Sequence, residues 1–428
     1  METQPLIAPV IDALREHHPN ADTSDVTRAF EVARTAHTGQ LRKSGEDYIT
    51  HPVAVTQILA ELGLNEVTLI ASLLHDTVED TPYSLTQLRV DFGDEIANLV
   101  DGVTKLDKLT YGPTAEAETV RKMVIAMSRD IRVLVIKLAD RLHNARTWSY
   151  VSSESAQRKA RETLDIYAPL AHRLGMNAIK WELEDLAFRY LEPEAYKAIA
   201  KALAERRADR EAYIARFVTE LRSLLAAQHL HAEVQGRAKH IYSIHRKMQR
   251  KRLTLDQLYD LRAVRIVCDS VAECYAALGV VHGHWPYIRG EFDDYIATPK
   301  DNFYRSIHTA VIGPAGVPVE VQIRTLEMHQ QAELGVAAHW RYKEGGARDA
   351  SFEKKIEWVR RLLDTPEATG AGDQDFLDRV RAELFEDRVY ALTPRGEVVD
   401  LPQGATALDF AYQVHTSLGH RCRGAKVN

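Results

Sequence analysis

The chain has 428 residues, of which 45% are hydrophobic and 27% are charged, and its formal net charge is −6. This length predicts two or three domains, each with its own hydrophobic core, and excludes a small module held together by disulfides. The negative charge argues against a general nucleic-acid coat. No run of about 18 apolar residues is present, so we expect no membrane span.

The cysteines and the first ten residues indicate in which cellular compartment the protein is located. Cys268, Cys274 and Cys422 show no Cys-x-x-Cys spacing, which indicates structural thiols in a reducing environment. The stretch METQPLIAPV lacks the basic start and the long apolar core of a signal peptide. We therefore expect a cytoplasmic protein with no membrane partner.

Residues 24–228 show helical periodicity and long alanine-rich, charged stretches, so we expect an all-α first half. Inside it, the segment LLHDTVED at residues 73–80 follows the mostly apolar run EVTLIAS. On one continuous helix, the polar side chains of this segment would share one arc, opposite an apolar arc. The polar arc holds His75, Asp76, Glu79 and Asp80, and the apolar arc holds Val67, Ile70, Ala71, Leu74 and Val78.

The adjacent histidine and aspartate of this segment suit a metal ion. A borderline-hard divalent ion accepts both imidazole and carboxylate ligands, and two carboxylates one turn later could position or deprotonate a water molecule. A helix cap or a solvated acidic face would give the same octapeptide. The segment alone therefore leaves both interpretations open.

Two further segments favour the metal site. GQLRKSGEDYITHPVAV places His51 immediately before a proline and a phosphate-binding group upstream, namely Arg42, Lys43 and Ser44. VLVIKLADRLHNART places three polar side chains at i, i+4 and i+7 on one helical face, namely Asp140, Asn144 and Thr147. A lone aspartate after an apolar run is usually structural, but the ordered set His, His-Asp and Asp is far more specific.

A basic segment, GRAKHIYSIHRKM, precedes the second half of the chain. On a helix, Lys239, Ser243 and Lys247 would lie at i, i+4 and i+8, opposite the apolar stripe of Ile241, Ile244 and Met248. Such a face suits a polyphosphate, and Arg237 adds a bidentate donor at its entrance. A solvated basic helix or an RNA contact is the alternative interpretation.

From residue 255 the pattern changes to short β-rich runs among helical segments, which predicts an α/β domain; the runs are LRAVRIVCD, YIATP, HTAVIG and VPVEVQIRT. In the last run, period-two alternation puts Val317, Val319, Val321 and Ile323 on one face and Glu320, Gln322 and Arg324 on the other. The polar row suits an active-site strand, although an exposed sheet face would alternate in the same way. Asp260, at the start of another predicted strand, is a candidate Mg²⁺ ligand.

The end of the chain predicts a third, small domain. Residues 364–375 are rich in Gly, Ala and Asp and indicate a linker. The following stretch, DRVYALTPRGEVVDLPQGATALDFAYQVH, predicts two strands, a turn and a helix. The chain then stops at GAKVN with strand-like residues, so we expect this domain to be incomplete.

The phrases RKSGEDYITHP, LLHDTVEDT and KLADRLHNART resemble one branch of the HD-domain phosphohydrolases, the hydrolase half of the RelA/SpoT family of alarmone enzymes. The resemblance implies a manganese ion (Mn²⁺) held by His51, His75, Asp76 and Asp140. It also implies that Glu79 and Asp80 act on the attacking water. The nucleotide would be contacted by Arg42, Lys43, Ser44, Asn144 and Thr147.

The second half resembles the synthetase half of the same family, in GRAKHIYSIHRKM, YDLRAVRIV, DYIATPKDNFYRSIHT, VEVQIRT and AELGVAAHW. That family transfers pyrophosphate from ATP to the 3′-hydroxyl of GDP or GTP. The resemblance implies that Asp260 holds Mg²⁺, that Tyr304 stacks on guanine and that Glu320 activates the 3′-hydroxyl. The other implied substrate-binding residues are Arg237, Lys239, Ser243 and Lys247 on the ATP side, Lys300, Asn302 and His308 on the guanine-nucleotide side, and Gln322 and Arg324.

Two departures from the family pattern occur in the second half. Many bifunctional members have a basic Arg-x-Lys-Asp segment where this chain has the acidic Glu291–Asp294, which is more typical of members that mainly synthesise. The usual Asn-Gly-Tyr-Gln-Ser is NFYRS here. The preference between GDP and GTP is therefore left open. From about Asp387 the tail resembles the start of a TGS domain, and in the family the region beyond it senses uncharged tRNA on the ribosome.

We therefore expect a multidomain α plus α/β protein: an all-α HD-type hydrolase domain with a helical connector at 1–195, a nucleotidyltransferase-like mixed α/β synthetase domain at 196–345, a helix and linker at 346–384, and a partial β-grasp TGS domain at 385–428. Such a protein would both make and hydrolyse (p)ppGpp. One alternative is a hydrolase whose second domain only binds nucleotides as a regulatory module. Another is a ribosome- or RNA-binding factor that uses the basic helix.

Overall fold

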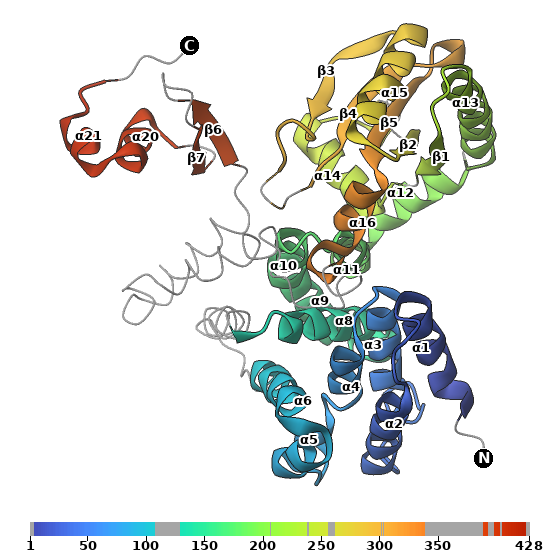
Figure 1. The fold of residues 1–428 in the computed structure, drawn as a ribbon, viewed down its shortest axis with the longest axis vertical. Coiled ribbons are helices and arrows are strands. Elements are labelled where there is room, and N and C mark those ends of the chain that lie inside the picture. Colours follow the sequence, from blue (N-terminus) through green and yellow to red (C-terminus); the bar gives the residue numbers. More distant parts are fainter. Residues whose placement is uncertain are drawn as a thin grey trace. The chain divides into compact units, whose positions relative to one another are not determined.

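The computed structural model describes residues 4–107, 129–205, 207–237, 239–255, 262–300, 302, 304–338, 388–392, 398–402 and 405–424 (Figure 1). Two compact units divide the chain: Met1–Leu109 with Lys122–Arg360, and Thr110–Arg121 with Arg361–Asn428. Asp260 and the predicted linker at 364–375 lie outside the described residues.

The first part of the larger unit is helical, as the sequence predicts, and it begins earlier than expected because a helix precedes residue 24. Its elements are α1 (Gln4–His17), α2 (Ser24–Ala36), α3 (Thr50–Glu61), α4 (Glu66–Leu73), α5 (Thr77–Asp80), α6 (Leu85–Asp107), α8 (Arg132–Arg146), η1 (Trp148–Tyr150), α9 (Ser153–Glu162), η2 (Thr163–Tyr167), α10 (Ala168–Arg173), α11 (Asn177–Leu191), α12 (Pro193–Glu205) and α13 (Arg207–Ala227). Helices α3, α4 and α8 pack together around fully buried side chains such as Leu59, Leu69 and Leu138. This core fixes the elements that carry the first predicted site.

The prediction of one continuous helix through residues 67–80 is wrong, because α4 ends at Leu73 and α5 begins at Thr77. The side chains at the break explain it. His75 Nδ1 donates to the Ser72 carbonyl at 2.6 Å, and Thr77 Oγ1 donates to the Leu74 carbonyl at 2.6 Å. These side-chain bonds occupy carbonyls that a continuing helix would use. The break turns His75 into the interior and leaves Glu79 and Asp80 exposed.

A five-stranded mixed sheet in the order β1-β2-β5-β4-β3 forms the second part of the larger unit, with β2 and β5 parallel and the other neighbours antiparallel. Its elements are β1 (Ala232–Arg237), α14 (Ile241–Lys251), β2 (Ala263–Cys268), α15 (Val271–His284), β3 (Tyr287–Asp294), β4 (Ile307–Ile312), η5 (Pro314–Gly316), β5 (Pro318–Thr325), α16 (Leu326–Leu334) and η6 (Gly335–Ala337). Helices α13 and α15 share one core with the apolar face of the sheet, for example Phe217 and Cys274 with Ile266 and Val321. The opposite face carries the polar side chains of β5.

Two edge strands differ from the sequence prediction. YIATP, at residues 295–299, is a turn and not a strand, because Asp294 Oδ1 accepts hydrogen bonds from the backbone of Ile296 and Ala297 at 3.0 and 2.9 Å. The edge strand in this region is β3, which ends immediately before the turn and was not predicted. The edge strand β1 was not predicted either. Both lie at the edges of the sheet and expose many side chains, so neither shows a clear apolar alternation.

The helical and sheet parts of this unit meet at a tight backbone junction. Asn177 Nδ2, at the start of α11, donates to the Ala332 carbonyl at 2.6 Å, and Val336 N donates to the Leu174 carbonyl at 2.9 Å. Gly335 has a φ of +58°, and a Cβ there would lie 2.1 Å from the Leu174 oxygen. The glycine of the phrase AELGVAAHW is therefore required by this junction.

The smaller unit contains β6 (Arg388–Leu392), β7 (Val398–Pro402), α20 (Ala407–Val414) and α21 (Thr416–Arg421). The two strands pair antiparallel, and a capping box between Thr406 and Asp409 begins α20. The predicted strands and helix are confirmed, while the residues that connect these elements at 393–397 and 403–404, where the predicted turn would fall, lie outside the described residues. None of the helices in the described ranges is long and apolar enough to cross a bilayer.

Candidate active sites

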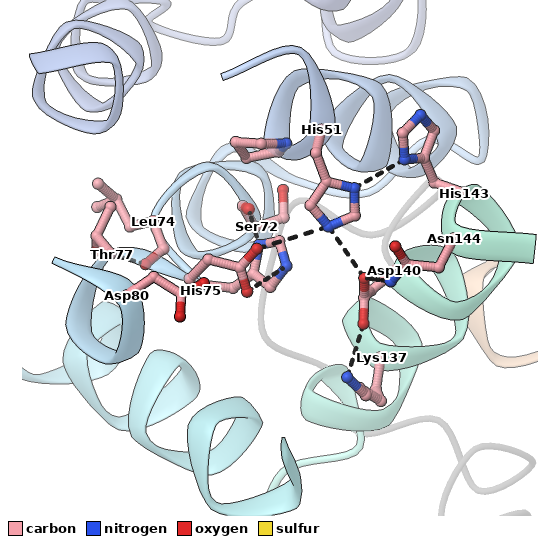
Figure 2. A network of polar contacts seen from close by, with 12 residues as sticks. His51, Ser72, Leu74, His75, Thr77, Asp80, Lys137, Asp140, His143 and Asn144 are labelled. Atoms are coloured by element: carbon pink, nitrogen blue, oxygen red, sulfur yellow. Dashed lines mark hydrogen bonds and ion pairs between the residues drawn. The ribbon is translucent and has the colours of Figure 1, made fainter. Parts of the chain in front are cut away.

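Four residues from separate segments converge in the helical part: His51 in the first turn of α3, His75 and Asp76 between α4 and α5, and Asp140 in α8. Figure 2 shows His51, His75 and Asp140 of this cluster. His51 Nε2 lies 3.1 Å from Asp140 Oδ1 and 3.5 Å from Asp76 Oδ2. His75 Nε2 lies 3.1 Å from Asp76 Oδ1. The structure thus brings together all four predicted metal ligands.

The donor atoms of this cluster fit a divalent metal ion. The ligand atoms of His51, His75 and Asp76 lie within 4.8 Å of one another. Because His75 donates through Nδ1 to a backbone carbonyl, its Nε2 faces the carboxylates, and this buried atom makes no hydrogen bond to any described residue. Burial lowers the pKa of His75, but Asp76 and Asp140 outweigh it and raise that pKa. A divalent ion would supply the positive charge that these carboxylates otherwise draw from a proton.

His51 is oriented by a second histidine that the sequence did not single out. His51 Nδ1 lies 2.7 Å from His143 Nδ1. Burial lowers the pKa of His143 to about 3, so His143 is neutral. We assign the shared hydrogen to His51 Nδ1, which directs the lone pair of His51 Nε2 into the cluster.

Asp140 is held by two neighbours on its own helix. Lys137 Nζ lies 2.6 Å from Asp140 Oδ2, and Asn144 Nδ2 donates to Asp140 Oδ1 at 2.6 Å. Burial alone would raise the pKa of Asp140, but the charge of Lys137 prevails and holds that pKa well below its ordinary value. Lys137 was not predicted, although its i, i+3 spacing from Asp140 in KLAD is a usable signal.

The predicted nucleotide-binding residues of this half only partly gather at the cluster. Arg42 Nη2 donates to Asn144 Oδ1 at 3.3 Å and to Thr147 Oγ1 at 3.2 Å. Lys43 is exposed, and Ser44 donates to Glu46 at 3.1 Å within the same turn. Asp140 and Asn144 of α8 and the following Thr147 therefore lie on one face, as predicted. Asn144 and Thr147 accept hydrogen bonds from Arg42.

Tyr48 is a site residue that the sequence reasoning missed. Its hydroxyl lies 2.8 Å from Asp76 Oδ2 and 3.1 Å from Asp80 Oδ2. Burial first, and the two carboxylates second, raise the pKa of Tyr48 far above its ordinary value, so the phenol keeps its proton and donates. Tyr48 thus connects a predicted metal ligand with a predicted water-activating carboxylate. Its position three residues before His51, in YITHP, was the available signal.

Tyr48→Phe should reduce metal-dependent turnover at this cluster by about 10- to 100-fold, the usual effect of removing a hydrogen bond to a metal ligand. Chemistry at the polar face of β5, in the sheet part, should be unaffected. The measurement is the hydrolysis rate as a function of metal concentration. Tyr83→Phe is the matched control, because it removes a similar bond, from Tyr83 to Asp91 at 2.7 Å, away from the cluster. Equal rates for Tyr48→Phe and this control would contradict the assignment.

The second predicted constellation lies on the polar face of β5. Gln322 Nε2 donates to Glu320 Oε1 at 2.9 Å, and Lys239 Nζ lies 2.5 Å from Glu320 Oε2. The predicted alternation is confirmed, and the alternative of an exposed sheet face is wrong, because Gln322 and Arg324 are 3% and 1% exposed. Burial would raise the pKa of Glu320, but the Lys239 ammonium prevails and lowers it.

The basic segment folds differently from the prediction at one point. Lys239 precedes α14 and so is not on a helical face with Ser243 and Lys247, because α14 begins only at Ile241. The cause is the cap: Asp185 of α11 accepts hydrogen bonds from Tyr242 N at 2.8 Å and Ile241 N at 3.4 Å, and so fixes the first turn. The apolar stripe is confirmed, with Ile244 buried against α11 and α12.

Helix α11 also contacts the residues on either side of Lys239. The sequence did not predict these contacts. Trp181 stacks on His240 with ring centroids 5.0 Å apart, and the Arg237 guanidinium lies 5.3 Å from the Trp181 ring centroid. Arg237 in turn reaches Glu320, with Nη1 3.9 Å from Oε1. Arg237 and Lys239 therefore both contact Glu320.

An aromatic group completes this site beside β4. Tyr304 Oη lies 2.8 Å from His308 Nε2, and burial lowers the pKa of His308 to about 3, so the neutral imidazole accepts the hydrogen bond. Lys300 Nζ lies 5.7 Å from the Tyr304 ring centroid. Asn302 donates to the His172 carbonyl of α10 at 3.2 Å. Strand register sets His308 opposite Gln322, which joins this group to the Glu320 face.

Each of the two sites lies in a part of the chain that matches a known protein family. Residues 29–177 match the HD domain, residues 236–347 match the region found in RelA / SpoT proteins, and residues 389–428 match the TGS domain. The HD and RelA/SpoT regions imply the use of divalent metal ions.

Relatives match along nearly the whole chain. A GTP pyrophosphokinase from Streptomyces coelicolor is 52% identical over 99% of this chain and 52% of its own length. The bifunctional (p)ppGpp synthase/hydrolase RelA from Mycobacterium tuberculosis is 51% identical over 100% of this chain and 58% of its own. A solved structure, small alarmone synthetase 1 from Bacillus subtilis bound to its product pppGpp, aligns with 44% of this chain and 98% of its own at 26% identity and a TM-score of 0.27.

The chain spans about half the length of the curated relatives that it matches. Within that half, the order HD domain, synthetase region and TGS domain is the order of the folded parts described above. The resemblance carried by the sequence motifs is thereby confirmed. The chain belongs to the RelA/SpoT family.

Proposed function

We propose that this chain is a bifunctional alarmone enzyme: a GTP/GDP pyrophosphotransferase that makes (p)ppGpp with ATP, and a 3′-diphosphatase that hydrolyses it to GDP or GTP and pyrophosphate. The observation that carries the proposal is that one chain holds two separate buried constellations, the four convergent metal donors and the Glu320 strand face. We place hydrolysis in residues 1–195 and synthesis in residues 196–345, followed by a linker at 346–384 and a TGS domain at 385–428.

In the hydrolase site, His51, His75, Asp76 and Asp140 would hold a manganese ion, which lowers the pKa of a bound water and supplies a nucleophile at neutral pH. Glu79 or Asp80 would take a proton from the attacking water. Tyr48 keeps the Asp80 carboxylate in place through its 3.1 Å hydrogen bond. The nucleotide is held by Arg42, Lys43, Ser44, Asn144 and Thr147.

In the synthetase site, Glu320 takes the proton of the 3′-hydroxyl of GDP or GTP. The 3′-oxygen attacks the β-phosphorus of ATP, the bond from that phosphorus to the α,β-bridging oxygen breaks, and AMP leaves. Without nucleotide, Lys239 binds Glu320 and lowers its pKa. ATP phosphates would draw Lys239 away from the carboxylate, so the base becomes stronger when the donor nucleotide arrives.

The remaining polar residues of this half divide between the two nucleotides. Arg237, Lys239, Ser243 and Lys247 would hold the ATP phosphates, and Asp260 would hold Mg²⁺. Tyr304 stacks on guanine, beside Lys300, Asn302 and His308, while Gln322 and Arg324 contact substrate from β5. The acidic Glu291–Asp294 segment lies in β3, at the sheet edge next to β4.

For the whole protein we propose a cytoplasmic location and, as partners, the ribosome and uncharged tRNA. The match to the TGS domain supports these partners, because in this family that domain begins the region that senses uncharged tRNA. The catalytic proposal does not depend on them.

The test is a pair of assays on the same preparation. ATP with GDP, and separately with GTP, is incubated in Mg²⁺ and scored for a new guanosine tetra- or pentaphosphate. That product is then incubated with Mn²⁺, or with EDTA, and scored for released pyrophosphate. Hydrolysis without synthesis would support a regulatory second domain, and no turnover of either kind would support a binding factor; either result overturns the bifunctional proposal.

A further inference from the structure

A cluster of charged side chains on α16 and the neighbouring strands surrounds Arg324, and three of its members, Arg265, His329 and Glu333, have no role assigned above. Glu333 Oε1 lies 3.0 Å from Arg324 Nη2 and 3.3 Å from Arg265 Nη2. His329 Nδ1, one turn earlier on α16, lies 2.6 Å from Arg324 Nη2 and 3.4 Å from Arg265 Nη1. One carboxylate and one imidazole thus hold two guanidinium groups side by side.

The strands explain why both arginines reach the same place. Arg265 of β2 is paired in register with Gln322 of β5, and Arg324 follows Gln322 by two residues on the same face. That face also carries Glu320. Arg265 and Arg324 therefore lie in one row with the proposed general base, and Glu333 approaches this row from α16.

The charges in this cluster do not balance. Burial and the neighbouring Arg324 lower the pKa of Arg265 to about 10, so the Arg265 guanidinium stays protonated at neutral pH. Burial and the same guanidinium groups lower the pKa of His329 to about 4, so His329 is neutral and accepts hydrogen bonds. Among the residues that the structure describes, Glu333 is then the single negative charge in contact with these two buried cations, and Arg324 is only 1% exposed.

Both arginines also retain unused donors. The Nε atoms of Arg265 and Arg324 are buried and make no hydrogen bond to any residue that the structure describes. Unpaired buried donors are rare in folded proteins, and each calls for an explanation such as a water molecule, an ion or a catalytic role. The uncompensated charge and the free donors both indicate an anionic ligand, which the polyphosphate or ribose-phosphate part of a nucleotide would provide.

We propose that Glu333 is a positioning residue for synthesis, which holds Arg265 and Arg324 side by side so that together they receive the anionic part of a nucleotide beside Glu320. The inference rests on the proposed synthetase function. Glu333 does not touch substrate; it acts through the two guanidinium groups, which repel each other without it. Nucleotide binding then completes the neutralisation that Glu333 begins.

The experiment is a double-mutant cycle on the full chain with synthesis as readout. Glu333→Gln should lower kcat/KM for (p)ppGpp synthesis by about 10- to 100-fold, and Glu333→Asp, which keeps the charge, should recover part of the loss. Because Glu333 acts through the arginines, adding Glu333→Gln to Arg324→Gln should cost little more than Arg324→Gln alone. Independent effects that multiply in the double variant would overturn the proposal.

Two controls separate positioning from instability and from failure of the proposed function. Glu327→Gln removes the same charge from an exposed position on the same helix and should leave synthesis unchanged. Hydrolysis by the same preparations should stay at the parent rate, which reports that the chain is folded. If the parent chain makes no (p)ppGpp, the proposed function fails; if the parent is active and Glu333→Gln equals it, only the role of Glu333 fails.

Discussion

Asp76→Ala should abolish release of pyrophosphate from (p)ppGpp while synthesis continues at the parent rate. Asp76 is the residue on which the cluster converges, since its two carboxylate oxygens lie 3.1 Å from His75 Nε2 and 3.5 Å from His51 Nε2. Losing a ligand removes several kcal/mol of metal-derived stabilisation, so the hydrolysis rate should fall by at least about a thousandfold. The Glu320 site shares none of these residues.

Hydrolysis and synthesis are measured on the same variant, and Mn²⁺ binding is measured separately by titration calorimetry. Asp94→Ala is the matched control, because Asp94 is a surface carboxylate of the same half, paired with Arg89 and 81% exposed at its side chain. Hydrolysis by Asp76→Ala at the parent rate, with metal present, would show that the cluster is not the hydrolytic site. Undiminished Mn²⁺ affinity would show that Asp76 is not a ligand.

Glu320→Gln should have the opposite selectivity. The amide has nearly the same volume and can keep a hydrogen bond with Lys239, but it cannot take a proton, so synthesis should fall by about 10² to 10⁴. ATP binding should survive, because Arg237, Lys239 and Lys247 are untouched. Hydrolysis should not change.

The measurement is the initial rate of synthesis at saturating ATP and GDP, with ATP affinity determined independently. Glu233→Gln is the matched control, since Glu233 is an exposed carboxylate on β1 of the same sheet. A synthesis rate above about a tenth of the parent rate would be incompatible with a general base of ordinary strength.

Local periodicity explains which structural predictions were confirmed. The row of Glu320, Gln322 and Arg324 follows from the period of two in a strand, and the face of Asp140, Asn144 and Thr147 follows from the helical repeat. In each case the apolar partners of the pattern lie within a few residues in the sequence. The pairing of these faces into sites was predicted only through the family resemblance.

Side-chain competition for the backbone explains two errors. The helix ends at Leu73 because His75 and Thr77 bond to carbonyls of the preceding turn, and Lys239 lies before α14 because Asp185 caps that helix. The first competition is local but too subtle for periodicity to reveal. The second depends on a residue more than fifty positions away, which no local pattern records.

The sequence by itself determined the class of fold, the two motif sets and the family, because elements and their faces are set by residues close along the chain. Tertiary structure alone decided which side chains from different elements contact one another. The phenol of Tyr48 lies between Asp76 and Asp80, and the carboxylate of Glu333 lies between Arg265 and Arg324. These contacts form between elements brought together by core packing. Tyr48 lies 28 and 32 positions from its two partners, and Glu333 lies 68 positions from Arg265 and nine from Arg324. Neither helical nor strand spacing encodes these contacts.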